Sequence, residues 1–538
     1  MAEGPAAAPP RPPRYFRNDA ELSRRDPYKQ LTASLNRLVT EHPPDKIAPG
    51  GGLYYGPISV AYLFYTLHKL YPDLTVDDYS MNTWSAAYIE QAQANMKQYA
   101  GPTTAACGIS DDIMALLALF AASAKDRDTV QELCDYAAVT TDEDASNEWL
   151  YGRAGYLYLL RLVRASFVDD DDDNDDDDKK TLELIDDTAA EVIDAVLDAP
   201  RPWKWHGKAY LGAAHGAVGI ITQVVLTDPT MAPRLEPELA ALLSYQFESG
   251  NFPSHIPPGK DRLVQFCHGA PGVVASLLSI RRFFPALDDR IERVVARARE
   301  CVLERGLLTK EPCLCHGISG NALALEDREF EHFLSYTTGH EIKCMERDGV
   351  LEKSDDPASL WCGEAGRAWA WAVADKRLEK RFLGPLHYLS FHLPSPNLGD
   401  FDLPVHLPSP QPPIEQLTYQ KRAARNNTPC HSTSTSSAVS QEENLLAESL
   451  LAVSPPAPDP FILQHHRCRR PRPCCGARPA SQVGLWVAQA NGFGSGSGAD
   501  EVGKWDGVGD RDVAGMDSAG GGGDGRSGCS LGGEWEVW

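Results

Sequence analysis

The sequence has no apolar run close to the roughly 20 residues that a membrane-spanning helix requires. Its best run, Met114 to Ala122, has nine residues, so we expect no transmembrane segment. The N-terminus, rich in Pro and Arg, also lacks the apolar core of a signal peptide. We therefore expect a cytoplasmic protein.

Positive charge is also scarce. The chain has 51 Lys and Arg against 75 Asp and Glu, a net charge of −24. Such a balance argues against a protein that neutralises phosphate backbones, so we expect no nucleic-acid partner. Without a secretion signal, the 13 cysteines are interpreted as thiols or metal ligands rather than a disulfide framework.

The 538 residues are too many for one ordinary core and indicate several domains or one repeat array. Alternation typical of strands is hard to find, whereas three segments carry apolar residues at helical spacing. These segments are residues 112–124, 181–199 and 289–308. We predict an all-α domain over residues 14–389, preceded by a disordered segment at 1–13.

Two further segments are predicted to be disordered. Residues 169–178 comprise nine Asp and one Asn, and we interpret 169–180 as a solvated acidic loop insertion rather than a metal site. Residues 390–538 are low in complexity and form a tail without catalytic function, either a lineage-specific extension or a gene-model artefact. The tail's Cys468, Cys474 and Cys475 lack paired CxxC spacing, which disfavours a metal site there.

A glycine motif recurs seven times in the predicted helical domain. Its first glycines are Gly56, Gly108, Gly152, Gly216, Gly269, Gly317 and Gly363. Successive spacings are 52, 44, 64, 53, 48 and 46 residues, and removing the twelve-residue insertion turns 64 into 52. The last five motifs read G-x-x-G, whereas Ser59 and Asp111 stand at the second position of the first two.

A period near 50 fits two helices and their connections. Because each motif precedes an apolar stretch, its glycines should lie where an inner helix begins and allow close backbone approach. Seven such hairpins can form an open solenoid or close into a ring with all seven motifs around one mouth.

Two of the motifs carry the same reactive triplet. Cys267-His268-Gly269 and Cys315-His316-Gly317 occur in register, 48 residues apart, which packing alone explains poorly. Thiolates and imidazoles suit zinc, and a catalytic zinc site leaves one position open. A free thiol is only ~3% ionised at pH 7, so ionisation at zinc raises the thiolate population by roughly 30-fold. If that thiolate adds to an activated alkene, His215, which has no Cys beside it, is the candidate acid/base.

Several motifs resemble those of the lanthionine synthetase C-like family. They are YLGAAHGAVGI, FCHGAPG, CHGISGNA, SLWCGEAG, the EWLYGRAG of residues 148–155, and the opening RYFRN of residues 14–18. The resemblance covers roughly residues 14–385. It implies an α/α toroid of seven inner and seven outer helices with one zinc ion at its centre.

The resemblance also implies roles for individual residues. Cys267, Cys315 and His316 correspond to the zinc ligands, His215 to the acid/base, and Glu148 to a carboxylate that assists it. In the binding of glutathione, Lys310 matches a lysine of the animal proteins, Lys353 is a weaker match to a basic contact, and Arg14 belongs to the opening motif. Cys313 can compete for the metal, but only Cys315 is in the Cys-His-Gly register, and His268 is expected beside the site rather than on the metal.

The expected function is therefore zinc-dependent addition of the glutathione thiol to dehydroalanine or dehydrobutyrine in peptides or proteins. A lanthipeptide-type cyclase is disfavoured because Leu263 replaces the active-site Arg of the bacterial enzymes. Phe266, which replaces the family's usual Trp before the first zinc Cys, is a further departure from the family pattern. Two more functions fit a zinc-bound thiol: a thiol prenyltransferase, whose zinc ligands and hairpin number differ, and a silent zinc- and glutathione-binding scaffold. A closed zinc site with a fourth protein ligand would indicate the scaffold.

Overall fold

The computed structural model describes residues 13–168 and 176–378. The chain divides into two units, residues 1–480 and 481–538, and the second unit lies outside the described residues. So do the predicted disordered N-terminus up to residue 12, residues 169–175 of the acidic insertion and the tail from residue 390. None of the helices in the described part of the chain has the length and apolar character that crossing a membrane requires.

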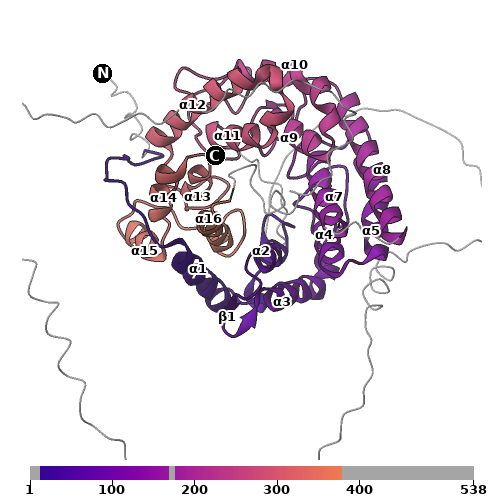
Figure 1. The fold of residues 1–538 in the computed structure, drawn as a ribbon, viewed down its shortest axis with the longest axis horizontal. Coiled ribbons are helices and arrows are strands. Elements are labelled where there is room, and N and C mark those ends of the chain that lie inside the picture. Colours follow the sequence, from indigo (N-terminus) through magenta and orange to yellow (C-terminus); the bar gives the residue numbers. More distant parts are fainter. Residues whose placement is uncertain (1–12, 169–175, 379–538) are drawn as a thin grey trace, which may run out of the picture. The chain divides into compact units, whose positions relative to one another are not determined.

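Seven helices of the described residues start at the glycine motifs and form an inner layer (Figure 1). They are α2 (Gly56–Leu70), α4 (Asp112–Ala124), α7 (Arg153–Phe167), α9 (Ala217–Thr227), α11 (Ala270–Ile280), α13 (Ile318–Ala322) and α16 (Glu364–Lys376). In the last five, the first glycine of the motif is the N-cap residue. The prediction that the motifs mark the beginnings of inner helices is confirmed.

Seven further helices of the described residues pack outside these, one against each inner helix. They are α3 (Met81–Ala94), α5 (Arg127–Asp135), α8 (Asp176–Asp198), α10 (Ala232–Leu243), α12 (Asp288–Arg305), α14 (Asp327–Ser335) and α1 (Pro27–Glu41). The first six follow their inner partners in sequence, whereas α1 packs against α16 from the other end of the domain. The predicted toroid of seven inner and seven outer helices is therefore present, and the ring is closed.

The remaining elements of the described chain are short. The helices are α6 (Ala137–Thr140), α15 (Gly339–Arg347) and 3₁₀ turns at Pro44–Lys46, Met96–Gln98, Pro229–Met231, Arg281–Phe283 and Pro285–Leu287. Strands β1 (Thr75–Val76) and β2 (Tyr79–Ser80) pair antiparallel, as do β3 (Ala209–Tyr210) and β4 (His255–Ile256). The described residues hold no larger sheet, in agreement with the all-α prediction.

Helix α8 begins earlier than the sequence pattern predicts. Residues 176–180 form its first turns, so this end of the acidic insertion is helical and not loop. Carboxylates are favourable at a helix N-terminus, where they face unpaired N–H groups. Lys180 Nζ also lies 2.8 Å from Asp177, and Arg127 pairs with Asp178 at 2.6 Å.

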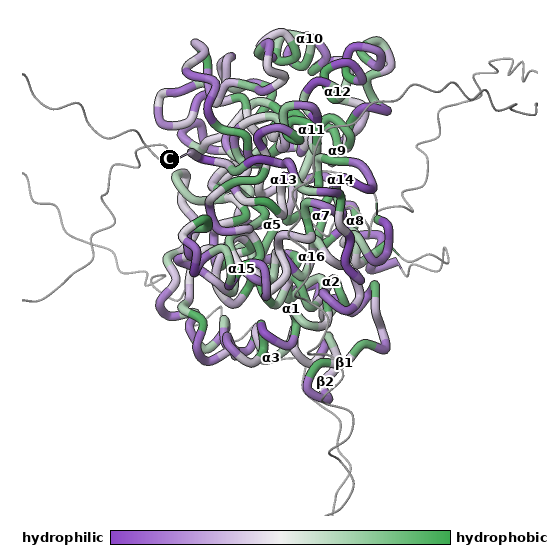
Figure 2. Tube along the Cα trace, turned by 90° about the vertical axis from the view of Figure 1, so that its left-hand side faces the viewer, coloured by the Kyte–Doolittle hydropathy of each residue, from purple (hydrophilic) through white to green (hydrophobic). Residues whose placement is uncertain are grey.

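The apolar residues lie mainly between the two layers and around the inner helices. Helices α2, α4, α9 and α11 are apolar on nearly every face because they have outer helices on one side and the filled centre on the other. The outer α12 instead buries one stripe, which includes Ile291, Val295 and Val302. Figure 2 shows apolar segments gathered among the inner helices and polar ones along the periphery.

Backbone hydrogen bonds join the loops that precede neighbouring inner helices. They run from Leu53 to Ile109, Cys107 to Tyr151, Trp149 to Ala214, Cys267 to Cys315, Cys315 to Trp361 and Trp361 to Tyr54, each from N–H to carbonyl. Between the fourth and fifth loops, Gly212 packs directly against the Cys267 carbonyl. The seven loops therefore form a continuous circle at one end of the ring.

The second glycine of each G-x-x-G motif touches the carbonyl of the residue six positions earlier. A Cβ on Gly272 would lie 1.9 Å from the Phe266 oxygen, and one on Gly320 would lie 1.8 Å from the Leu314 oxygen. No side chain fits at such distances, because the obstructing atom is backbone. These glycines fold each loop tightly over the start of its inner helix.

Helix α1 is held on α16 by a buried carboxylate between two guanidinium groups. Arg37 Nη2 lies 2.7 Å from Glu364 Oε1, and Arg367 Nη2 lies 2.5 Å from Glu364 Oε2. Burial opposes ionisation of Glu364, but Arg367 and Arg37 outweigh it and lower the pKa of this carboxyl to about 2. The ion pair fastens the closure of the ring.

We expect Gly272→Ala to lower the free energy of unfolding by about 3 kcal/mol, since the new methyl group would overlap the Phe266 carbonyl. Gly259→Ala is the matched control, because its Cβ would meet only His255 Nε2, at 3.9 Å. Denaturant unfolding of the two variants and the wild type measures the difference. Equal stability of all three would contradict the role given to the second glycine.

The Glu364 carboxylate should make the stability depend on pH at the acid end. Its pKa is about 2 in the folded chain against an ordinary value of 4.5, so its contribution is complete above about pH 4.5 and is lost as the pH falls towards 2. The difference corresponds to about 3 kcal/mol. Between pH 5 and pH 3, the free energy of unfolding should fall less in Glu364→Gln than in the wild type, whereas exposed Glu300→Gln should follow the wild type. Parallel curves for all three proteins would contradict this assignment.

Candidate functional site

The two Cys-His-Gly loops lie side by side in the circle of loops. Cys267 precedes α11, and Cys315 and His316 precede α13; the Cys267 N–H donates to the Cys315 carbonyl at 3.1 Å. One potential ligand atom from each of Cys267, Cys315 and His316 lies within 4.8 Å of the other two. Both cysteines are buried, and the imidazole is 18% exposed. The structure thus gathers the three residues that the sequence predicted as zinc ligands.

The two thiols of this cluster have pKa values shifted in opposite directions. A hydrogen bond with Cys315 lowers the pKa of Cys267 well below its usual range, against the effect of burial and with help from His268 and His316. The same hydrogen bond, followed by burial, raises the pKa of Cys315. Cys267 is consequently the first of the pair to become a thiolate.

The imidazole and the first thiol of the cluster each have a polar partner. Glu311 Oε1 lies 2.5 Å from His316 Nε2, and Gln265 Nε2 donates to Cys267 Sγ at 3.0 Å. A carboxylate on one nitrogen of a histidine orients the ring and leaves the other nitrogen for a metal. Two sulfurs from buried cysteines and one nitrogen from a partly buried histidine form a donor set that suits zinc.

A second group of donors overlaps the first. Cys313, His316 and Cys362 also have ligand atoms within 4.8 Å of one another. The predicted competition from Cys313 therefore has a structural basis, although Cys313 is not part of the group that contains Cys315. The sequence analysis missed Cys362. Its signal was its position immediately before Gly363, which corresponds to His316 before Gly317.

His215 and Glu148 come from neighbouring loops of the circle and meet directly. His215 Nδ1 lies 2.6 Å from Glu148 Oε2, and the buried Glu148 also accepts the backbone N–H of Leu150 at 3.0 Å and that of Tyr151. The Trp205 ring stacks on the imidazole with centroids 3.9 Å apart. Both the orientation and the tautomer of His215 are thereby determined, with Nε2 as its second nitrogen.

His268 lies between this pair and the cysteine cluster. Its ring is 5.8 Å from that of His215 and 5.4 Å from that of Tyr210, and its pKa is lowered by burial. It belongs to neither group of potential metal ligands among the described residues. This placement matches the expectation that His268 lies beside the site.

The three basic residues expected to bind glutathione lie on adjacent backbone segments. Thr309 N–H donates to the Arg14 carbonyl at 2.9 Å, and Glu352 N–H donates to the Thr309 carbonyl at 2.8 Å. Residues 14, 310 and 353 are therefore brought together from three distant parts of the chain. Arg14 and Lys310 are partly exposed, and Lys353 is exposed.

Arg14 is also connected to the cysteine cluster. Its Nη2 donates to Gln265 Oε1 at 3.4 Å, and Gln265 in turn bonds to Cys267. Burial, and then Arg262, lower the pKa of the Arg14 guanidinium. The basic segments thus adjoin the candidate metal ligands.

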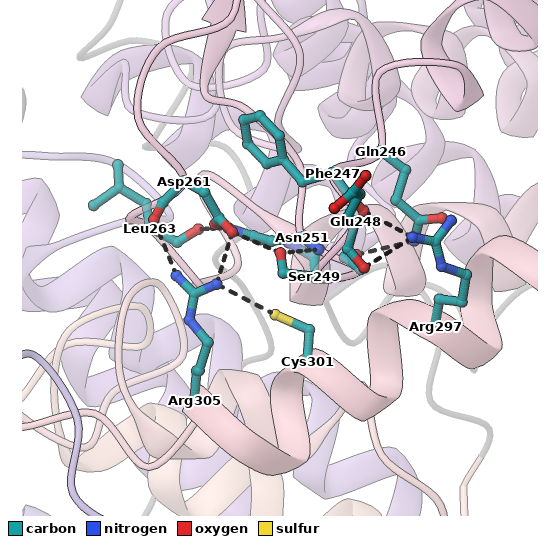
Figure 3. A network of polar contacts seen from close by, with 12 residues as sticks. Gln246, Phe247, Glu248, Ser249, Asn251, Asp261, Leu263, Arg297, Cys301 and Arg305 are labelled. Atoms are coloured by element: carbon teal, nitrogen blue, oxygen red, sulfur yellow. Dashed lines mark hydrogen bonds and ion pairs between the residues drawn. The ribbon is translucent and has the colours of Figure 1, made fainter.

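A polar network anchors the loop that leads to Cys267 (Figure 3). Arg305 of α12 pairs with Asp261 at 2.9 Å, and Asn251 donates to Asp261 at 2.8 Å and to the Leu263 carbonyl at 2.9 Å. The Asn251 oxygen accepts the N–H of Ala270, the first residue of α11. The segment from 261 to 270 is therefore attached to the helical scaffold at both ends.

Aromatic side chains fill the centre of the circle beside the cluster. The Phe266 ring lies 5.1 Å from that of Trp361 and 6.2 Å from that of Trp149, and Tyr54 stacks on Trp361. All four side chains are buried. Phe266, found where the family resemblance leads one to expect Trp, therefore packs against two tryptophans from other loops.

Comparison with known proteins gives consistent results. The family model for lanthionine synthetase C-like protein matches residues 50–366. Glutathione S-transferase LANCL1 of Danio rerio is 29% identical over 198 residues, which cover 33% of this chain and 45% of that protein. LanC-like protein GCL1 of Arabidopsis thaliana is 27% identical over 260 residues, which cover 44% and 57%. The chain spans about half the length of these curated relatives.

Among solved structures, nisin cyclase matches with a TM-score of 0.47 and 13% sequence identity. The match covers 68% of this chain and 98% of that chain.

Proposed function

Because the chain belongs to the lanthionine synthetase C-like family, we propose that it adds the thiol of glutathione to dehydroalanine or dehydrobutyrine in peptides or proteins, with one zinc ion per chain. The product is a thioether. The observation that carries the proposal is the cluster of Cys267, Cys315 and His316 in the same circle of loops as the His215–Glu148 pair. The name of one relative, a glutathione S-transferase, supports the choice of thiol.

The cluster supplies three of the four ligands of a tetrahedral zinc site. Cys267, Cys315 and His316 would hold the ion, and the fourth position would be open to a substrate thiol. Bound zinc supplies the ionisation and positioning of that thiol. Glu311 keeps the His316 ring in place, and Gln265 donates to the Cys267 sulfur.

His215 delivers the proton that completes the addition. The sulfur forms a bond to the β-carbon of the dehydroamino acid, and the electrons of the carbon–carbon double bond move to give an enolate. His215 then protonates the α-carbon from Nε2, since Glu148 accepts the N–H of Nδ1. His215 Nε2 first takes up the proton that the glutathione thiol loses, so the imidazolium returns to the neutral ring when it protonates the α-carbon and the step balances.

The basic segments would bind the rest of glutathione. Arg14, Lys310 and Lys353 can pair with its carboxylates, because glutathione carries two of them and the three residues lie on adjacent segments. Arg14 is joined through Gln265 to Cys267, so a glutathione bound there has its thiol on the side of the cluster.

A silent zinc- and glutathione-binding scaffold is less well supported. It requires a fourth protein ligand that closes the metal site, and neither Cys313 nor His268 belongs to the group formed by Cys267, Cys315 and His316. Peptide cyclisation is disfavoured because Leu263 stands where the bacterial cyclases have an active-site Arg. We also propose a cytoplasmic location, since the eight cysteines of the described residues are all free thiols.

The proposed reaction can be tested by intact mass. The full chain with zinc, glutathione and a dehydroalanine peptide should give a glutathione adduct of the peptide. His215→Asn should slow its formation by about 10² to 10⁴-fold while zinc content is unchanged, because general acid catalysis contributes that much. His340→Asn, an exposed histidine on α15, is the matched control. Absence of adduct with the wild type would reject the enzyme, and full activity of His215→Asn would reject this acid.

The role of Arg14 predicts a separate effect on glutathione binding. Arg14→Ala should raise the KM for glutathione about tenfold or more and change kcat little, because one charge-assisted contact is worth about 1.5–3 kcal/mol. Arg17→Ala, an exposed arginine three residues away, should leave the KM unchanged. A KM for glutathione in Arg14→Ala equal to that of Arg17→Ala and of the wild type would rule out a contact from Arg14.

A further inference from the structure

Two buried cysteines have no part in the proposed reaction. Cys313 lies in the loop before α13, and Cys362 directly precedes the N-cap residue of α16. Both thiols are buried, and their sulfurs lie within 4.8 Å of each other. Their loops are neighbours in the circle, joined by the bond from Cys315 N–H to the Trp361 carbonyl at 3.0 Å.

These two thiols converge on the same imidazole as the first pair. The ligand atoms of Cys313, Cys362 and His316 lie within 4.8 Å of one another, as do those of Cys267, Cys315 and His316. The Cys313 sulfur also accepts the backbone N–H of His316 at 3.4 Å. His316 thus stands between two pairs of thiols.

Packing alone does not account for this arrangement. A buried cysteine usually behaves as a small apolar residue, and Cys134 and Cys301 are buried without joining a second thiol in any group of potential ligands among the described residues. In the part of the chain that the structure describes, only the four cysteines around His316 belong to groups of three potential ligands. Four thiols and one imidazole in a buried cluster are the ligands that thiophilic cations select.

We propose that Cys313, Cys362 and His316 form a second position for a thiophilic divalent cation such as Zn²⁺, alternative to the position at Cys267 and Cys315. Two thiolates and a neutral imidazole offset the charge of such an ion in this buried environment. The Tyr54 hydroxyl, 3.9 Å from the Cys362 sulfur, is a further polar group beside the position.

The two positions exclude each other because they share one imidazole nitrogen. Glu311 occupies His316 Nε2, which leaves Nδ1 for a metal. An ion at the second position takes His316 away from Cys267 and Cys315. An ion at the second position is therefore not bound by Cys267 and Cys315, the sulfurs to which the proposed function assigns it. The second position can exist whether or not the protein catalyses the proposed reaction.

Cobalt binding to the full chain tests the proposal, since cobalt–thiolate charge-transfer absorption reports the sulfur ligands directly. We compare Cys267→Ser/Cys315→Ser, Cys313→Ser/Cys362→Ser and the quadruple variant, with Cys134→Ser/Cys301→Ser as the matched buried control. Each of the first two should bind one equivalent of Co²⁺ with a thiolate band, and the quadruple variant should lose the band. The wild type and the control should bind one equivalent and not two.

Loss of the thiolate band in Cys267→Ser/Cys315→Ser, with circular dichroism like that of the wild type, would overturn the second position. Two equivalents bound by the wild type would overturn the mutual exclusion.

A measurement on the wild type covers the case in which a variant does not fold. Alkylation of the metal-free chain and of the chain with one equivalent of zinc, followed by peptide mass analysis, should show partial protection of all four cysteines. Protection confined to Cys267 and Cys315 would contradict the proposal. Because neither measurement uses glutathione or a dehydroamino acid, their outcome is separate from that of the adduct experiment.

Discussion

Close backbone contact at the glycine motifs is the constraint on which the rest of the structure depends. Each second glycine lets a loop fold over the start of its own helix, with a carbonyl where a side chain would otherwise be. The loops then present N–H and carbonyl groups to their neighbours and form the circle of hydrogen bonds. The candidate ligands and His215 lie in these loops. A residue larger than glycine at the second motif position would therefore displace the reactive side chains together with the backbone.

Closure of the ring and assembly of the candidate glutathione site depend on the same N-terminal segment. Helix α1 packs against α16 and is fastened there through Arg37 and Glu364. The residues before α1 run beside residues 307–309, where Phe16 N–H donates to the Leu307 carbonyl at 2.9 Å. That path brings Arg14 next to Gln265 and the cysteine cluster. The segment that leads into the outer helix completing the ring therefore also places a basic side chain beside Gln265 and the cysteine cluster.

The surroundings of His316 combine two opposing demands. Burial disfavours its charged form, whereas Cys313, Cys267 and Glu311 raise the pKa of the imidazole above its usual range. A metal requires the neutral ring and ionised thiols, so binding a cation would release protons from this cluster. The acidic partner Glu311 orients the ring in either case. Four thiols and one imidazole give the centre five potential donors, one more than a single tetrahedral ion can use.

The local features of the fold could be predicted from the sequence because they depend on local chemistry. Apolar spacing placed α4 at residues 112–124, and the recurrence of glycines marked the start of every inner helix. The spacing failed at the start of α8, because five polar residues have no apolar pattern and are helical through charge at the N-terminus. The Cys-His-Gly register marked the two triplets, since repeated loops place equivalent residues side by side, and the family resemblance selected Cys267, Cys315 and His316 from them.

The sequence by itself therefore determined the all-α fold class, the sevenfold repeat and the group of donors formed by Cys267, Cys315 and His316. Only the tertiary structure decided that the ring closes, because the contact between α1 and α16 joins opposite ends of the domain and has no local signal. It also brought Arg14, Lys310 and Lys353 together. Finally, it placed Cys362 beside Cys313 and His316, a proximity that arises because successive loops of a closed ring meet at its centre.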